Sequence, residues 1–201
     1  MATTTLRLAQ DPDADALLAR DPLALLVGML LDQQFPMERA FASPYQLARR
    51  LSLDTLDAGA IADHDPDAFA KVMAGPPALH RYPVAMAGRV QALCRHVAGE
   101  WGGDAAELWR TAATGRELLA RLRSLPGFGE QKARIFVALL GKQLGVRSPG
   151  WREAAGPYGE DGSHRSVADV TDAESLAQVR AFKQAAKQAA QRPVIQPGRT
   201  L

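Results

Sequence analysis

The sequence contains a single cysteine, Cys94, among its 201 residues. One thiol cannot form a disulfide within the chain, a cysteine-built zinc site or an iron–sulfur cluster held by four cysteines. The four histidines lack metal-ligand spacing, and neither a G-x-x-x-x-G-K-S/T nor a G-x-S-x-G sequence is present. Metalloenzymes, nucleotide hydrolases and α/β-hydrolases therefore have little support, and we expect no metal held by side chains and no cofactor.

Long apolar runs are also missing. The longest, from Leu23 to Leu31, is stopped by Asp32, whereas a membrane helix needs about 20 predominantly apolar residues. The N-terminus has no basic segment followed by an apolar one and a small-residue cleavage site, so it does not predict a secretion signal. We expect a cytoplasmic protein without membrane association.

The net charge is only +2, but the charges are unevenly distributed. Acids dominate from Asp11 to Asp67, whereas residues 116–147 contain seven basic residues and only two acids, and no acid follows Glu174. Basic segments of this kind suit a polyanion, because each phosphate contact releases counterions and adds affinity that is independent of sequence. The alternative is a basic face that is simply solvated.

Apolar residues recur at helical spacing, and no segment shows the strict alternation of a half-buried strand. The pattern predicts an all-α protein, with one domain over residues 1–191 and a flexible tail at 192–201. The predicted helices, with their Pro, Asp and Thr start signals, cover Pro22 to Gln34, Pro36 to Leu51, a short stretch from Pro66, Ala87 to Glu100, a short stretch from Asp104 to Arg110, Thr114 to Ser124, Glu130 to Leu144, and Asp172 to Gln191.

The stretch LPGFGEQKA, from Leu125 to Ala133, predicts a tight hairpin between two helices. Gly127 and Gly129 can adopt backbone angles closed to other residues, and without Cβ atoms they let a phosphate approach the main chain. The amides that open the following helix add its positive dipole end, Lys132 and Arg134 add charge, and the hairpin carbonyls can hold a monovalent cation. The alternative is an ordinary turn between helices.

Two separated segments resemble the helix–hairpin–helix (HhH-GPD) superfamily of base-excision DNA glycosylases, which includes the endonuclease III-like and adenine-glycosylase-like proteins. DPLALLVGMLLDQQ, at residues 21–34, is similar to a family helix that begins with D/N-P and ends in glutamine. LRSLPGFGEQKARIFVALLGKQLG is similar to the family's hairpin and the helix after it, and AMAGRVQALCRHV between them resembles the connecting helix. The resemblance covers Asp21 to Leu144.

This resemblance implies a two-lobed helical fold with a six-helix barrel, a hairpin motif at 115–144, and a monomer that bends double-stranded DNA and flips out a damaged or mispaired base. Flipping is required because a protein group cannot reach a glycosidic bond inside a stacked duplex. Gln34, and with it Gln33, matches the glutamine that enters the duplex at the vacated position. The residues expected at the DNA are Gln33, Gln34, Gly127, Phe128, Gly129, Gln131, Lys132 and Arg134.

The sequence departs from the family at its catalytic positions. The family's aspartate lies about twenty residues beyond the hairpin, where this chain has Pro149, and the lysine of bifunctional members is replaced by Gln131. We therefore expect a monofunctional glycosylase without lyase activity. Three hypotheses account for the missing carboxylate. In the first, Asp32 replaces it, since this acid interrupts an apolar face; in the second, Glu153, or Asp161 farther on, replaces it. In the third, the protein binds or senses damaged DNA without catalysis.

Aromatic residues offer candidates for a base pocket. Trp151 and Tyr158 can stack on an extruded base, although such residues are more often core anchors. His80, Arg81 and Tyr82 can approach the lesion or the opposite strand, and nothing in the sequence fixes their direction. A further hypothesis for the whole protein, besides a glycosylase and a non-catalytic DNA-binding protein, is that the fold binds a protein partner in place of DNA. The sequence does not name the lesion.

Overall fold

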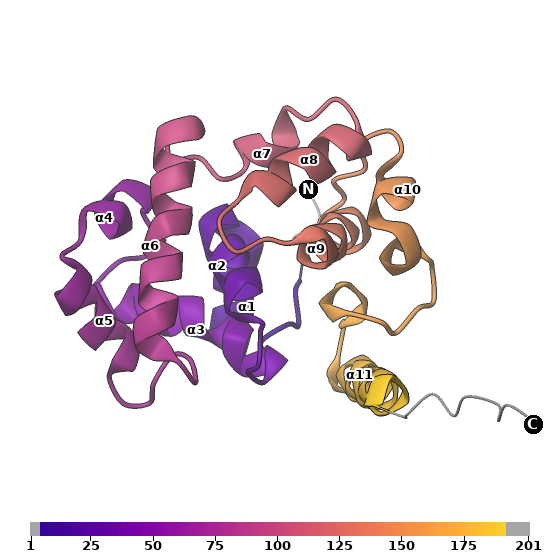
Figure 1. Ribbon diagram of the computed structural model, residues 1–201, viewed down its shortest axis with the longest axis horizontal. Helices are drawn as coiled ribbons and strands as arrows, with labels where there is room; N and C mark the ends of the chain where they lie inside the picture. Colours follow the sequence, from indigo (N-terminus) through magenta and orange to yellow (C-terminus); the bar gives the residue numbers. More distant parts are fainter. Residues whose placement is uncertain (1–4, 192–201) are drawn as a thin grey trace, which may run out of the picture.

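The computed structural model describes residues 5–191, and this part of the chain is helical with no strand, so the predicted all-α class is confirmed. Figure 1 shows the helices in two groups along the long axis of the molecule. The first group consists of α1 (Pro12–Arg20), α2 (Pro22–Leu31), α3 (Met37–Arg50), α4 (Ala58–Asp63), α5 (Pro66–Ala74) and α6 (Pro83–Glu100). The second consists of α7 (Glu107–Arg110), α8 (Gly115–Ser124), α9 (Glu130–Gln143), α10 (Trp151–Ala155), the 3-10 helices η1 (Gly156–Gly159) and η2 (Val167–Asp169), and α11 (Ala173–Gln191).

Helix α2 lies at the centre, with every residue from Leu23 to Leu31 buried. Its start is fixed by Asp21, whose carboxylate accepts hydrogen bonds from the amides of Ala24 (3.0 Å) and Leu56 (2.7 Å). Burial raises the pKa of the Asp21 carboxyl, while these backbone donors oppose the rise. The cap therefore joins the beginning of the central helix to a loop that follows α3.

The end of α2 differs from the prediction. The helix stops at Leu31 and not at Gln34, because Asp32 leaves the helical region (ψ +70°) and Gln34 takes a positive φ of +52°. Pro36 also disfavours helical angles at Phe35, so the chain does not return to the helix after Gln34. Both glutamines consequently lie on a turn beyond the helix.

Other predicted helices are found within a few residues of their expected ends. Helix α8 begins directly after Thr114, whose hydroxyl accepts a hydrogen bond from the Glu117 amide at 3.2 Å. Helix α6 begins at Pro83, four residues before the expected start. The sequence pattern did not indicate this first turn, because Val84 and Ala85 are exposed and the turn lacks the apolar spacing of the later ones.

Three short helices were not predicted. Helices α1 and α4 are capped by the side chains of Asp11 and Asp57, and Asp11-Pro12 is the same start signal that marks α2. Helix α10 falls between the predicted helices that end at Leu144 and begin at Asp172. The expected tail at 192–201 lies outside the described residues.

Within residues 5–191 no helix is long and apolar enough to cross a membrane.

Candidate nucleic-acid interface

The hairpin, residues 125–129, has one side pressed against the end of α2. The Phe128 amide donates to the Leu125 carbonyl at 3.0 Å, which closes a turn with Pro126 and Gly127 at its centre. Gly127 has a φ of +83°, and a Cβ atom there would lie 2.4 Å from Cδ1 of Leu30. The hairpin therefore requires glycine at this position both for its backbone angle and for its contact with the central helix.

The other side of the hairpin is open. Gly129 is exposed, and a Cβ atom built on it meets nothing within 4 Å. It is also the N-cap of α9, where no side chain accepts from the helix amides. The positive end of a 14-residue helix is thus accessible next to a bare backbone, an arrangement that suits an approaching phosphate.

Phe128 does not face this open side. Its side chain is 4% exposed, and its ring meets that of Phe136 edge to face, with centroids 6.0 Å apart. The prediction that Phe128 contacts DNA is therefore not supported by its position. Phe128 instead fixes the hairpin on α9 through the core.

Lys132 is likewise turned inward. Its Nζ donates to the carbonyl oxygens of Met29 (2.6 Å) and Leu30 (2.9 Å), which have no backbone donor at the end of α2. Burial lowers the pKa of Lys132 to about 8, against the opposing charge of Asp32. Lys132, which the sequence predicted to bind a phosphate, instead holds α9 against the central helix α2 in this structure.

Arg134 and Gln131 are also engaged within the protein. Arg134 donates to Glu130 Oε1 at 2.7 Å and to the carbonyl of Ala154 at 3.2 Å. Gln131 is exposed, and its Nε2 donates to the Tyr158 hydroxyl at 2.9 Å. Of these two, Gln131 remains accessible at the first turn of α9, whereas Arg134 links α9 to α10.

The turn after α2 is held by a histidine. We call residues 33–35, Gln33 to Phe35, the glutamine segment. Nδ1 of His80 accepts from the Tyr82 amide at 3.0 Å, so Nε2 carries the proton and donates to the Gln33 carbonyl at 3.0 Å. His80 is 2% exposed, and burial lowers its pKa, which favours this neutral form.

A cavity of about 240 Å³ lies between the glutamine segment and the start of α6. Gln33, Gln34 and Tyr82 all contribute to its wall. Gln34 is exposed, and the Tyr82 ring is 47% exposed. The structure therefore brings these three predicted residues together at one accessible edge.

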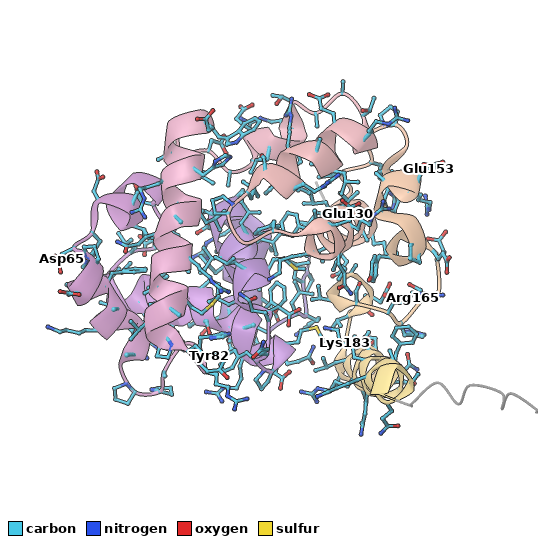
Figure 2. All side chains as sticks on the ribbon, viewed as in Figure 1. Asp65, Tyr82, Glu130, Glu153, Arg165 and Lys183 are labelled. Atoms are coloured by element: carbon cyan, nitrogen blue, oxygen red, sulfur yellow. The ribbon has the colours of Figure 1, made fainter. Side chains whose placement is uncertain are left out.

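The two candidate acids lie in different places. The Asp32 side chain is 11% exposed, and its Oδ2 lies 3.7 Å from Nζ of Lys183 on α11. Glu153 is exposed and borders a separate groove that Pro149 also lines. Figure 2 shows Glu153 well apart from Lys183, the partner of Asp32. Asp32 alone adjoins the glutamine segment, while Asp161 pairs on the surface with Arg152 at 2.8 Å.

The aromatic candidates also separate. The Trp151 ring is 5% exposed, and its Cε3 would lie 2.4 Å from a Cβ on Gly141. The guanidinium of Arg152 covers the ring at 4.5 Å from its centroid. Trp151 is therefore a core anchor in this structure, with no free face for a base, which corrects its assignment to a base pocket.

Tyr158, in contrast, lines a cavity of about 380 Å³ between α9 and α11. Gln131 contributes to the same cavity. So do three residues that the sequence did not indicate as part of a site: Arg165, Phe182 and Lys183. Figure 2 shows Arg165 and Lys183 close to α11. The sequence signal for Lys183 is the run without acids after Glu174, which indicates a basic region but not its position, and no such signal marks Arg165 or Phe182.

Among residues 5–191, no three or more His, Cys, Asp or Glu side chains gather in a group that could hold a metal ion. A monovalent cation at the hairpin carbonyls stays a prediction.

The buried amine of Lys132 predicts a pH-dependent stability. Between its folded pKa of about 8 and its ordinary 10.5, the unfolded chain holds a proton that the folded chain has released. The free energy of unfolding therefore rises with pH across this window. Compared with Lys132→Met, the wild-type protein should gain about 1–3 kcal/mol between pH 7.5 and 10.

Urea denaturation of both proteins at several pH values measures this gain. The exposed lysine of α5 supplies the control, since Lys71→Met should follow the wild type at every pH. Parallel curves for wild type and Lys132→Met would contradict the inward position of the amine.

No family model matches this sequence, and searches of curated proteins and of solved structures return no match either. The resemblance to DNA glycosylases consequently depends on the two sequence motifs, and the functional argument depends on the site.

Proposed function

We propose that this protein is a DNA glycosylase of base-excision repair, which hydrolyses the N-glycosidic bond of a flipped-out damaged or mispaired base. The observation that carries the proposal is the contact between the two motifs. Gly127 lies against Leu30, and Lys132 binds the carbonyls of Met29 and Leu30. Two segments about a hundred residues apart are thereby joined into one surface, with a phosphate site on one side and glutamines on the other.

The glutamine segment suits the gap left by a flipped base. The Gln33 and Gln34 amides can replace hydrogen bonds of the broken pair, and the exposed Tyr82 ring can stack on a neighbouring base. His80 fixes the Gln33 backbone by its hydrogen bond, so this segment is held in place before DNA arrives. The cavity between α9 and α11 offers the Tyr158 and Phe182 rings to the extruded base.

Asp32 is the carboxylate that we assign to the chemistry. It lies beside the glutamine segment, and its negative charge can stabilise the positive charge that develops on the deoxyribose. The glycosidic electron pair leaves with the base, water forms the new bond at C1′, and the carboxylate accepts the proton of that water. In the free protein this carboxylate forms an ion pair with Lys183 at 3.7 Å.

A covalent lyase step finds no nucleophile here. Gln131 occupies the position of the family's Schiff-base lysine, and the Lys132 amine is bound to two carbonyl oxygens. Bound in this way, the amine points toward the end of α2 and away from the open side of the hairpin. The proposal is accordingly a monofunctional glycosylase, whose product is an intact strand with an abasic site.

Base release from a panel of duplexes tests the proposal. Each duplex carries one uracil, alkylated, oxidised or mispaired base, and strand breaks are compared with and without hot alkali. Breaks that appear only after alkali support a monofunctional glycosylase and identify its substrate. Breaks without alkali would contradict the absence of lyase chemistry, and no release from any duplex would contradict catalysis on these lesions.

Gly129 gives a test of the DNA interface that leaves the fold intact. Because a side chain at Gly129 meets open space and its φ of −79° is allowed for any residue, Gly129→Val should not change the fold. The valine would stand where a phosphate approaches the α9 amides. We expect duplex affinity to fall about 10-fold or more, as for the loss of a charge-assisted hydrogen bond.

Fluorescence anisotropy with a labelled duplex measures the affinity. Gly99→Ala, at an exposed glycine near the end of α6 where a Cβ atom meets nothing within 4 Å, serves as the control away from the hairpin. Wild-type affinity in Gly129→Val would remove the hairpin from the DNA interface.

The second candidate is a protein that binds damaged DNA without catalysis. It is favoured by Pro149, which stands where the family has its catalytic aspartate. The Pro149 carbonyl accepts a hydrogen bond from the Gly115 amide at 2.8 Å. Pro149 is packed on the start of α8, and the nearest acid along the chain is Glu153, four residues later. Tight binding to an abasic duplex without base release would favour this function.

A further inference from the structure

In the second half of α11, the basic residues lie on the side of the helix that is buried in its first half. Leu176 and Val179 are buried and mark the inward face of the helix. At 100° per residue, Arg180, Lys183 and Lys187 continue that face. The outward positions hold alanine and glutamine: Ala181, Gln184, Ala185 and Gln188. Residues 180–189 are all exposed, so this side of the helix is open to solvent beyond Val179 and carries cations in place of apolar residues.

Two acids of the first helical group now face the stripe. Arg180 lies 2.5 Å from Oε1 of Glu38, and Lys183 lies 3.7 Å from Oδ2 of Asp32. These acids flank the glutamine segment on either side. Lys187 has no ion-pair partner among residues 5–191, and the Arg180 and Lys183 side chains are about half exposed. The stripe therefore has more positive charge than its acidic neighbours neutralise.

We propose that this stripe is a binding surface for the phosphodiester backbone of the DNA strand that passes the glutamine segment. The inference rests on the proposed function and extends it to α11. In the free protein Lys183 pairs with Asp32, and in the complex Lys183 transfers to a phosphate. The exchange leaves the Asp32 carboxylate beside the sugar of the flipped nucleotide. Helix α11 is in this way both a phosphate clamp and a cover for the acid.

The occupant follows from charge and spacing. Lys183 and Lys187 are separated by about one helical turn, roughly 6 Å, which is close to the spacing of adjacent phosphates along a strand. No acid follows Glu174, so nothing on the later part of the helix repels a polyanion. Each phosphate that the stripe neutralises adds about 0.9 to the slope of log affinity against log salt concentration.

The experiment measures that slope in the full-length protein. The probe is a labelled duplex with one tetrahydrofuran abasic analogue, titrated by fluorescence anisotropy at several salt concentrations. Lys183→Gln/Lys187→Gln should lower the magnitude of the slope by about two relative to wild type. The control Lys71→Gln/Arg95→Gln removes two exposed cations from α5 and α6, at the opposite end of Figure 1, and should keep the wild-type slope.

A third variant tests the stripe against the charge of the helix as a whole. Gln184→Lys/Gln188→Lys adds two cations to the outward face and should leave the slope unchanged. The stripe would not be the binding surface if the magnitude of the slope rose by about two in Gln184→Lys/Gln188→Lys. The same conclusion would follow from an equal fall of the slope in Lys183→Gln/Lys187→Gln and in the control variant. A wild-type slope in Lys183→Gln/Lys187→Gln, with affinity lost in Gly129→Val, would overturn the role of α11 and leave the DNA function standing. No duplex binding by the wild type would overturn both.

Discussion

Replacing Asp32 with asparagine is expected to slow base release by about 100- to 10,000-fold, the range that a positioned acid or base contributes. Asparagine keeps the shape of the side chain but neither accepts the proton of water nor opposes positive charge on the sugar. The rate is measured in single-turnover experiments on the lesion that the duplex panel identifies. Affinity for the abasic duplex should not fall and should rise modestly, because Lys183 then has no Asp32 carboxylate to leave before it binds a phosphate.

Glu153→Gln is the matched control for this prediction. Glu153 is an exposed acid in a separate groove, so its neutralisation should leave the rate of base release unchanged. The assignment of Asp32 fails if Glu153→Gln lowers the rate and Asp32→Asn does not. Equal rates in wild type and in both variants would exclude the two carboxylates together.

Replacing Trp151 with alanine is expected to lower the free energy of unfolding by about 3–5 kcal/mol, the cost of removing a large buried aromatic side chain. Its ring fills the space left by Gly141 on α9, and its backbone lies against the start of α8 at Gly115. The vacated volume is bounded by close backbone contacts and cannot collapse easily. Urea denaturation followed by circular dichroism measures the loss.

Tyr158→Phe provides the comparison for Trp151. This change removes only the hydroxyl that accepts from Gln131, so it should cost about 1 kcal/mol or less. An unchanged stability in Trp151→Ala, combined with lost base release, would restore Trp151 to the base pocket that the sequence suggested and contradict its place in the core.

The hairpin shows how much of a site can be predicted from local sequence. Leu125, Pro126 and Gly127 specify a turn with a positive φ at the glycine, and the structure has one at +83°. The start of α9 follows from the same stretch. Sequence spacing also placed Lys132 and Arg134 behind the hairpin, but it could not show that their side chains bind carbonyls of Met29, Leu30 and Ala154. Those acceptors come from distant segments.

The sequence alone determined the all-α class, most helix positions and the local shape of the hairpin, because periodicity, caps and backbone preferences act between neighbouring residues. Only the tertiary structure decided which side chains share a site. It placed Trp151 in the core and Tyr158 on a cavity, separated Glu153 from Asp32, and brought Lys183 beside Asp32. Burial and charge pairing depend on contacts between segments far apart in the chain, which no local pattern specifies.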